Sequence, residues 1–328
     1  MIAVVIPCFR VSRQILGVIS GIGEEIDRIY VVDDHCPEYS GQVVRDNSID
    51  PRVQVIFLSF NQGVGGATIA GIQQAVIDGA SVIVKMDGDG QMESAFIPAL
   101  VKPIVQGEAD YTKGNRFFYL DGLLSMPTFR LIGNAGLSFL SKLSSGYWNI
   151  FDPTNGFFAI EGKVASVVPW RKINKRFFFE SDLLFRLNII QAKVIDIPMP
   201  AIYEDEISNL NPWRELPRFF TAHLHNFSKR IFYNYILRNF SIASIELLLS
   251  LPLLIFGILY GLSQWSISFP TASAGTVMLS ALPIILGFQL LLAFFSYDMQ
   301  SLPQFPLQQR LTQLESLKAY NKHTKTLL

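Results

Sequence analysis

Cysteine and charge are both scarce in this chain of 328 residues. Its two cysteines, Cys8 and Cys36, are too few for a disulfide framework and lack the spacing of a metal site, so we expect buried thiols. Only 16% of the residues are charged, and the 27 basic and 27 acidic residues cancel. That balance argues against nucleic acid as a partner, because proteins that bind it carry a basic surface. The first seven residues lack the basic region of a signal peptide and predict a strand instead.

What the chain has in abundance is apolar sequence, distributed differently in its two parts. Hydrophobic residues make up 50% of it, and the mean hydropathy of +0.31 is high for a wholly soluble enzyme. Up to about residue 210, short β-branched runs alternate with stretches of helical length. Predicted strands cover residues 3–6, 29–32, 53–58 and 82–86, and predicted helices cover 14–26 and 67–77. Apolar strands separated by helices indicate an α/β domain with a mostly parallel sheet covered on both faces.

Two long apolar stretches follow this domain. Residues 241–262 carry one charge, Glu246, and residues 275–295 carry none. Each stretch has about the ~20 residues that span the hydrocarbon core of a bilayer. The alternative is a core helix of a soluble protein, but two adjacent stretches of spanning length favour a transmembrane hairpin over 241–297.

Basic residues flank the predicted hairpin on both sides, whereas the loop 263–274 has no lysine or arginine. The positive-inside rule therefore predicts that both ends and the α/β domain are cytoplasmic, with the loop outside. The predicted organisation is a catalytic domain over 1–210, interfacial helices over 211–240, the hairpin over 241–297 and a cytoplasmic tail over 298–328. We expect an integral protein, most simply of a bacterial inner membrane.

The segment 213–238 mixes aromatic and basic residues, among them Lys229 and Arg230. That composition predicts amphipathic helices in the membrane interface, whose basic side chains reach toward headgroups. The alternative is a helix packed on the globular domain. Its two histidines, His223 and His225, are expected to be polar surface residues.

Chemistry is concentrated where two predicted strands end. The strand 82–86 is followed by Asp87 and Asp89, separated by one glycine. At the carboxyl edge of an open α/β sheet both carboxylates can reach the crevice where such folds bind ligands, and Mg²⁺ or Mn²⁺ prefers such oxygen ligands. A solvated turn is the alternative for an isolated pair of this kind.

A second acidic pair, Asp33 and Asp34, ends the strand 29–32 at the same predicted edge. Either carboxylate there could accept a hydrogen bond from a nucleobase. The glycine-rich segment 61–67, which includes Gly66, follows the third strand and would let backbone amides approach a phosphate or ribose. It is no dinucleotide fingerprint, because the G-x-G-x-x-G spacing is absent.

These motifs, in this order, resemble glycosyltransferase family 2, with its GT-A fold. The opening run 5–9, including Pro7, is similar to the family's first strand, and Asp33-Asp34 resembles its nucleotide-binding strand end, although His35-Cys36 replaces Gly-Ser. Residues 87–91, which end in Gln91, are similar to the metal motif of the dolichyl-phosphate mannose synthase branch. Further motifs of that branch resemble the segments around Arg116, Asp152, and Glu180 with Asp182. The paired C-terminal spans look like those of bacterial polyprenyl-phosphate glycosyltransferases.

The resemblance implies transfer of a sugar from a nucleotide-sugar to a polyprenyl phosphate with inversion at the anomeric carbon. It assigns catalytic roles to Asp89, Arg116, Asp152, Glu180 and Asp182, donor binding to Pro7, Asp33, Asp34, Gly66 and Asp87, and Mg²⁺ or Mn²⁺ to Asp87, Asp89 and Gln91. Arg116 would pair with phosphate. A hydroxyl acceptor would need Asp182 or Glu180 as a base, whereas an ionised lipid phosphate needs none. Both acids could instead merely favour a helix N-terminus.

Two other functions stay open. The enzyme could extend a lipid-linked glycan such as an O-antigen, or the domain could bind nucleotide-sugars as a scaffold without turnover. Segment 203–210 bears three acids and no lysine where the bacterial group has a basic element, which weakens the case for a simple lipid monophosphate. A homo-oligomer is also compatible with the sequence.

The predicted metal role can be tested at one residue. We expect Asp89→Ala to abolish transfer while the protein still folds and inserts, because losing one ligand of a hard cation removes charge stabilisation. Sugar transfer in membranes measures this. Full activity of the variant, or undiminished wild-type activity in excess EDTA, would contradict the metal role.

Overall fold

The computed structural model describes residues 1–118, 128–200, 212–267 and 272–326. Contacts divide the chain into two compact units, Met1–Phe227 together with Pro303–Leu328, and Ser228–Leu302. The predicted divisions at residues 210, 240 and 297 follow composition and stay predictions. The acidic segment 203–210 lies outside the described residues.

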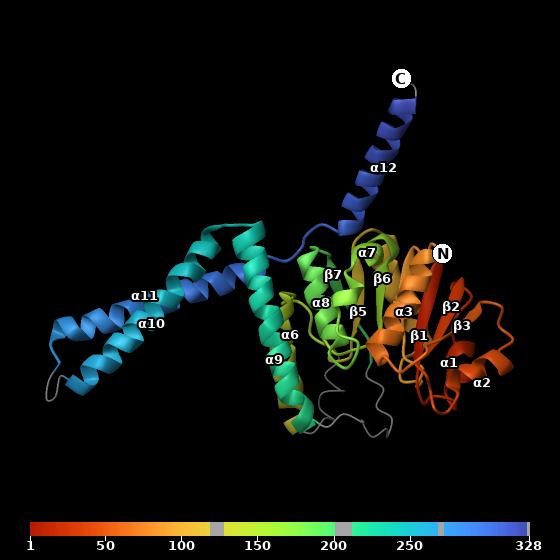
Figure 1. The fold of residues 1–328 in the computed structure, drawn as a ribbon, viewed down its shortest axis with the longest axis horizontal. Helices are drawn as coiled ribbons and strands as arrows, with labels where there is room; N and C mark the ends of the chain where they lie inside the picture. The colour runs from red at the N-terminus through yellow and green to blue at the C-terminus, as the bar shows by residue number, and fades with distance from the viewer. Residues whose placement is uncertain (119–127, 201–211, 268–271, 327–328) are drawn as a thin grey trace. The chain divides into compact units, whose positions relative to one another are not determined.

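The first unit is built on a seven-stranded sheet with the order β3-β2-β1-β4-β6-β5-β7 (Figure 1). Its strands are β1 (Ile2–Cys8), β2 (Arg28–Asp33), β3 (Val53–Phe57), β4 (Val82–Lys85), β5 (Tyr111–Asn115), β6 (Phe158–Glu161) and β7 (Val194–Pro198). Every neighbouring pair is parallel except the two that β6 makes with β4 and β5. The predicted mostly parallel sheet is therefore confirmed, and the first four strands lie where the sequence predicted them.

Helices cover both faces of the sheet. On one face, α1 (Ile15–Ser20), α2 (Ser40–Asn47) and α4 (Ile97–Val105) enclose a core with Val4, Ile6 and Val84. On the other face lie α3 (Val64–Ile77) and α8 (Phe179–Ile189). A Cβ on Gly71 of α3 would overlap Val5 of β1, so that glycine allows close packing of helix on sheet.

Among the described residues, this unit also contains α6 (Thr128–Ser145), α7 (Gly162–Val167), the 3₁₀ turns η1 (Ser94–Phe96) and η2 (Trp170–Lys172), most of α9 (Pro212–Ile231), and α12 (Leu307–Thr326). The predicted helix 14–26 ends early, at Ser20. Gly21 and Gly23 follow it, and glycine disfavours helix continuation.

The second unit is a helical hairpin of α10 (Ile242–Ile267) and α11 (Ala274–Gln300). Both helices are long and apolar enough to cross a membrane, and only 22% and 11% of their most apolar stretches is buried. A core helix of a soluble protein would be mostly buried, so the exposure favours spanning helices. Small residues bring the pair together: a Cβ on Gly257 would lie 2.7 Å from Ile284, and one on Gly287 would lie 2.9 Å from the Ser250 carbonyl.

A buried ion pair within this second unit corrects one expectation. Arg230 does not reach outward as predicted for an interfacial residue, since it is 1% exposed. Its guanidinium donates to both carboxylate oxygens of Asp298, at 2.6 and 2.9 Å. The hydroxyl of Tyr235, in the π-helical segment η3 (Phe232–Arg238), donates to the same carboxylate at 2.6 Å. Arg230 therefore ties the segment before the first span to the end of the second.

The tail predicted over 298–328 contains α12, which belongs to the first unit. Asp110, fully buried before β5, accepts hydrogen bonds from the Leu307 and Gln308 amides at 2.6 and 2.8 Å. It also accepts one from the amide of Lys193 at 2.7 Å. One carboxylate thus caps α12 and joins it to the strand β7, a long-range contact that composition could not reveal.

We expect Asp110→Ala to destabilise the first unit, because three amides would lose their acceptor. An unsatisfied buried donor costs roughly 1–3 kcal/mol. Thermal unfolding in detergent, followed by tryptophan fluorescence, measures the loss. Asp46→Ala, at an exposed acid of α2, is the matched control and should change stability little. Equal unfolding temperatures for the two variants would contradict the capping role.

Candidate active site

Parallel strands bring the predicted site residues to one edge of the sheet. The strands β1, β2, β4 and β5 all end there, so the acids after β2 and β4 and the arginine after β5 meet. Because β6 runs the other way, it begins at this edge, and Asn155 and Gly156 arrive just before it. Of the cavities at this edge, two are lined by both Asp87 and Asp89.

The β1 cavity is the one that reaches the end of β1. The residues that line it include Pro7, Asp34, Asn61, Gly63, Val64, Arg176 and Phe177. Asp34 accepts hydrogen bonds from the Gln62 and Gly63 amides at 2.6 and 2.8 Å, and burial raises the pKa of its carboxyl. Gly63 has a φ of 86°, which favours glycine in this turn. The carboxylate thus fixes the glycine-rich loop against the end of β2.

The two adjacent acids of the β2 end differ in what they face. Asp33 lies outside the cavity lining, and its carboxylate accepts from the amides of Cys36 and Gly41 at 2.7 and 2.6 Å. It shapes the turn that contains His35 and Cys36. Gly66 is also outside the lining, and its amide donates to the Lys175 carbonyl at 3.1 Å. Of the predicted donor-binding residues, Pro7, Asp34 and Asp87 line the cavity.

A buried lysine stands behind Asp87. Lys85, the last residue of β4, is 1% exposed, and its Nζ lies 2.7 Å from Asp87 Oδ1. A Cβ on Gly156 would overlap that Nζ and lie 2.9 Å from Asp87 Oδ2. Glycine at position 156 therefore leaves room for the ion pair, which holds one oxygen of Asp87 inward.

Asp89 and Gln91 form the rest of the predicted metal site. The Gln91 amide donates to Asp89 Oδ1 at 3.0 Å, and both residues line the β5 cavity with Asp87. Two carboxylates and an amide oxygen suit Mg²⁺ or Mn²⁺, which keeps several positions for phosphate and water. Among the described residues no third His, Cys, Asp or Glu completes a cluster. The three side chains therefore fit a divalent cation.

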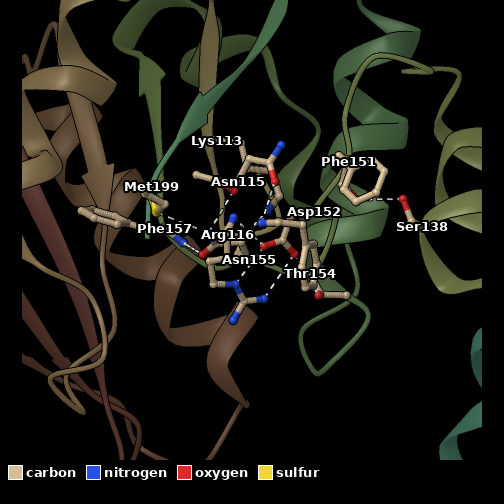
Figure 2. Close-up of polar contacts among 12 residues, drawn as sticks. Lys113, Asn115, Arg116, Ser138, Phe151, Asp152, Thr154, Asn155, Phe157 and Met199 are labelled. Atoms are coloured by element: carbon tan, nitrogen blue, oxygen red, sulfur yellow. Dashed lines mark hydrogen bonds and ion pairs between the residues drawn. The ribbon is translucent and has the colours of Figure 1, made fainter. Parts of the chain in front are cut away.

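The β5 cavity lies on the other side of the acid pair, and Arg116, Glu93, Thr154, Asn155, Gly156 and Met199 are among its lining. Figure 2 shows Arg116 directed at Asp152, which is fully buried behind it. The guanidinium donates from Nε at 2.8 Å and from Nη2 at 3.2 Å to the two carboxylate oxygens. This two-point contact fixes the arginine, so Asp152 orients a lining residue without lining the cavity itself.

Glu180 and Asp182, the predicted base candidates, do not line either cavity. Glu180 is buried, and burial raises its pKa while the nearby cations Lys85 and Lys113 lower it. Asp182 is 5% exposed and accepts from the amide of Asn174 at 2.8 Å. Both lie in the first turn of α8, behind the site rather than in it.

A model described as glycosyl transferase family 2 matches residues 3–169. The chain belongs to glycosyl transferase family 2. A UDP-N-acetylglucosamine–dolichyl-phosphate N-acetylglucosaminyltransferase from Methanococcus voltae is 26% identical over 219 residues, which cover 62% of this chain and 87% of that relative. An undecaprenyl-phosphate mannosyltransferase from Micrococcus luteus is 27% identical over 176 residues, covering 53% of this chain and 71% of that one.

A solved structure shows the same architecture. Glucosyl-3-phosphoglycerate synthase from Mycobacterium tuberculosis, in complex with Mn²⁺, UDP and phosphoglyceric acid, superposes with a TM-score of 0.52. The identity is 17%, and the match covers 70% of this chain and 78% of that one. At this identity the likeness shows the fold, and it confirms the GT-A prediction.

Several site residues of this family 2 enzyme were not predicted from the sequence. Glu93, Asn155 and Arg176 line cavities, and Lys85 and Lys113 form the layer beneath. Lys85 and Lys113 both pair with Phe158 of β6, so they lie in one row of the sheet. Lys113 donates to the Asn155 carbonyl. A lysine inside an apolar strand was the available signal, since a buried charge requires a partner.

The Gly156 geometry yields a test. We expect Gly156→Ala to lower transfer roughly tenfold or more, because overpacking costs about 1–3 kcal/mol and would displace the Lys85–Asp87 pair. Initial rates in purified membranes measure the change. Gly133→Ala in α6 is the control, since its Cβ would meet nothing within 4 Å. Equal rates for both variants would mean that the pair tolerates displacement.

Proposed function

We propose that the protein is an inverting glycosyltransferase that moves a sugar from a nucleotide-sugar to a polyprenyl phosphate at the cytoplasmic face of a membrane. The observation that carries this proposal is the junction of two cavities at Asp87 and Asp89, with Arg116 in the second cavity. One cavity suits a donor and the other an anionic acceptor. The named polyprenyl-phosphate sugar transferases among its relatives support the same acceptor class.

The donor would bind along the β1 cavity. Asp34, at the end of β2, lies where a nucleoside would enter, and Arg176 lines the same space. The diphosphate would then reach Asp87, Asp89 and Gln91. A bound Mg²⁺ or Mn²⁺ there would supply neutralisation of the charge that develops on the leaving diphosphate. Lys85 holds Oδ1 of Asp87, so a cation would bind this carboxylate through Oδ2.

The acceptor would enter the β5 cavity and meet Arg116. Asp152 fixes the guanidinium at the cavity wall, where its planar donors would bind a lipid phosphate. The ionised phosphate oxygen would attack the anomeric carbon on the side away from the leaving diphosphate, which inverts that centre. An ionised phosphate needs no base, and this agrees with the position of Glu180 and Asp182 behind the cavity.

Membrane attachment would keep the enzyme near such an acceptor. The helices α10 and α11 are long enough to span a membrane. Lysine and arginine occur in the sequence before α10 and after α11 but not in the loop 263–274. By the positive-inside rule, the catalytic unit would face the cytoplasm, where nucleotide-sugars are made. The membrane that we propose is a bacterial inner membrane.

A second candidate is the extension of a lipid-linked glycan. Glu93 is exposed and lines the β5 cavity, so a sugar hydroxyl bound there would have a carboxylate within the same space. In that reaction Glu93 would accept the proton of the attacking hydroxyl. The two acceptors therefore differ in whether they depend on this residue.

The proposal is tested with vesicles and a panel of radiolabelled nucleotide-sugars. Inverted vesicles should transfer label to an organic-soluble lipid that mild acid releases, and sealed right-side-out vesicles should not. Labelling only in right-side-out vesicles would overturn the cytoplasmic orientation. Nucleotide-sugar binding without any turnover in either preparation would favour the scaffold function.

Two substitutions separate the acceptors. For a phosphate acceptor, Glu93→Gln should keep the rate within about twofold, whereas Arg116→Gln should lower it by roughly 100-fold, since a charge-assisted contact is worth about 1.5–3 kcal/mol. For a hydroxyl acceptor, Glu93→Gln should lower the transfer rate by a factor of about 100 or more, as expected for a lost general base. Glu38→Gln, at an exposed acid outside both linings, is the control.

A further inference from the structure

The loop 174–178 forms one wall of the β1 cavity. Arg176 and Phe177 line that cavity, and Arg176 is the basic residue among the lining side chains. No motif of the sequence pointed to this loop, which precedes α8. Its position therefore depends on what holds it, and the contacts on its two sides differ.

On the side of the sheet, the loop is fastened to the glycine-rich segment. The Gly66 amide donates to the Lys175 carbonyl at 3.1 Å, and Lys175 Nζ donates to Gln62 Oε1 at 2.6 Å. A Cβ on Gly63 would lie 2.6 Å from the Lys175 carbonyl, so the two backbones approach closely. This side joins the loop to the residues that Asp34 organises.

On the other side, the loop is fastened to α9. Asp182 accepts from the Asn174 amide at 2.8 Å and from Nδ2 of Asn226 at 3.1 Å, so one carboxylate joins loop and helix. Asn226 is 4% exposed. Arg186 Nε lies 3.6 Å from the same carboxylate.

Aromatic packing reinforces this junction. The Phe178 ring lies 5.8 Å from Phe219 and 4.8 Å from His223, both on α9. His223 is buried and pairs with the Ser144 hydroxyl at 2.7 Å, so the expectation that it lies on the surface is wrong. Burial lowers its pKa to about 4, and it is therefore neutral at neutral pH. His225, in contrast, is exposed as expected.

We propose that Asp182 is a positioning residue. Through its contact with Asn226, the packing of α9 determines the position of Arg176, and with it the affinity for the donor nucleotide. The inference rests on the proposed function only for the identity of the ligand. Along the chain, α9 continues into the segment before the first span, so the membrane-proximal helix and the donor wall share one carboxylate. Asp182, predicted as a catalytic base, acts here through the loop.

The first measurement is hydrogen exchange on the full-length protein in detergent without nucleotide. Asn226→Ala and Asp182→Asn should each speed exchange of the amides of 174–178 by about tenfold or more, as the loss of a hydrogen bond to a charged group implies. The control is His225→Asn, at the exposed neighbour of Asn226, which should leave this exchange unchanged. Unchanged exchange in both test variants would contradict the role of the Asp182–Asn226 contact in holding the loop.

The second measurement is binding of UDP and GDP with Mn²⁺ by calorimetry, beside the rate at saturating donor. We expect Asn226→Ala to raise the Kd of the nucleotide that the wild type binds by about tenfold, with the saturated rate within about threefold. A lost rate with unchanged Kd in Asp182→Asn would make Asp182 a base and overturn the positioning role. A wild type that binds neither nucleotide would count against the proposed function. The exchange measurement would still decide whether the Asp182–Asn226 contact holds the loop.

Discussion

The parallel pairing of β1 with β2 and β4 is the constraint on which the site depends. Parallel strands end at the same edge, so the residues after each strand meet there although they are dozens of positions apart in sequence. The antiparallel β6 completes the edge from the opposite direction, since the residues before it, Asn155 and Gly156, reach the same place. With a single slip of register, Lys85 would leave its row beside Phe158 and Asp87 would lose its partner.

Beneath that edge lies a layer of buried charge. Lys85 and Lys113 occupy one row of the sheet, with Glu180 of α8 close enough to influence both electrostatically. Burial lowers the pKa of Lys113 to about 8 and raises that of Glu180, so each charge depends on its neighbours. Removing any member would leave an uncompensated charge in a low dielectric, which costs far more than a lost surface pair. Through Lys85, the layer therefore holds Asp87 in a fixed geometry.

Carboxylates throughout the first unit serve as junctions between distant segments. Asp34 joins β2 to the loop before α3, Asp110 joins β7 to α12, and Asp182 joins α8 to α9. Each accepts backbone or amide donors that would otherwise be unsatisfied in the interior. This use explains why several acids that sequence motifs single out turn away from the cavities: a buried carboxylate can organise a loop as well as bind a ligand.

The sequence by itself determined the first four strands, the two apolar stretches and the acids Asp87 and Asp89 at a strand end, because periodicity and strand ends are local properties. The order of short motifs determined the family and pointed to Arg116. Only the tertiary structure decided that Asp34 rather than Asp33 faces the cavity, that Asp152 and Asp182 lie behind it, and that Arg230 and His223 are buried. Adjacent residues at a strand end point in different directions, and their partners are set by loops that return from far along the chain. Which acid meets solvent and which meets an amide is therefore a consequence of folding that no local pattern contains.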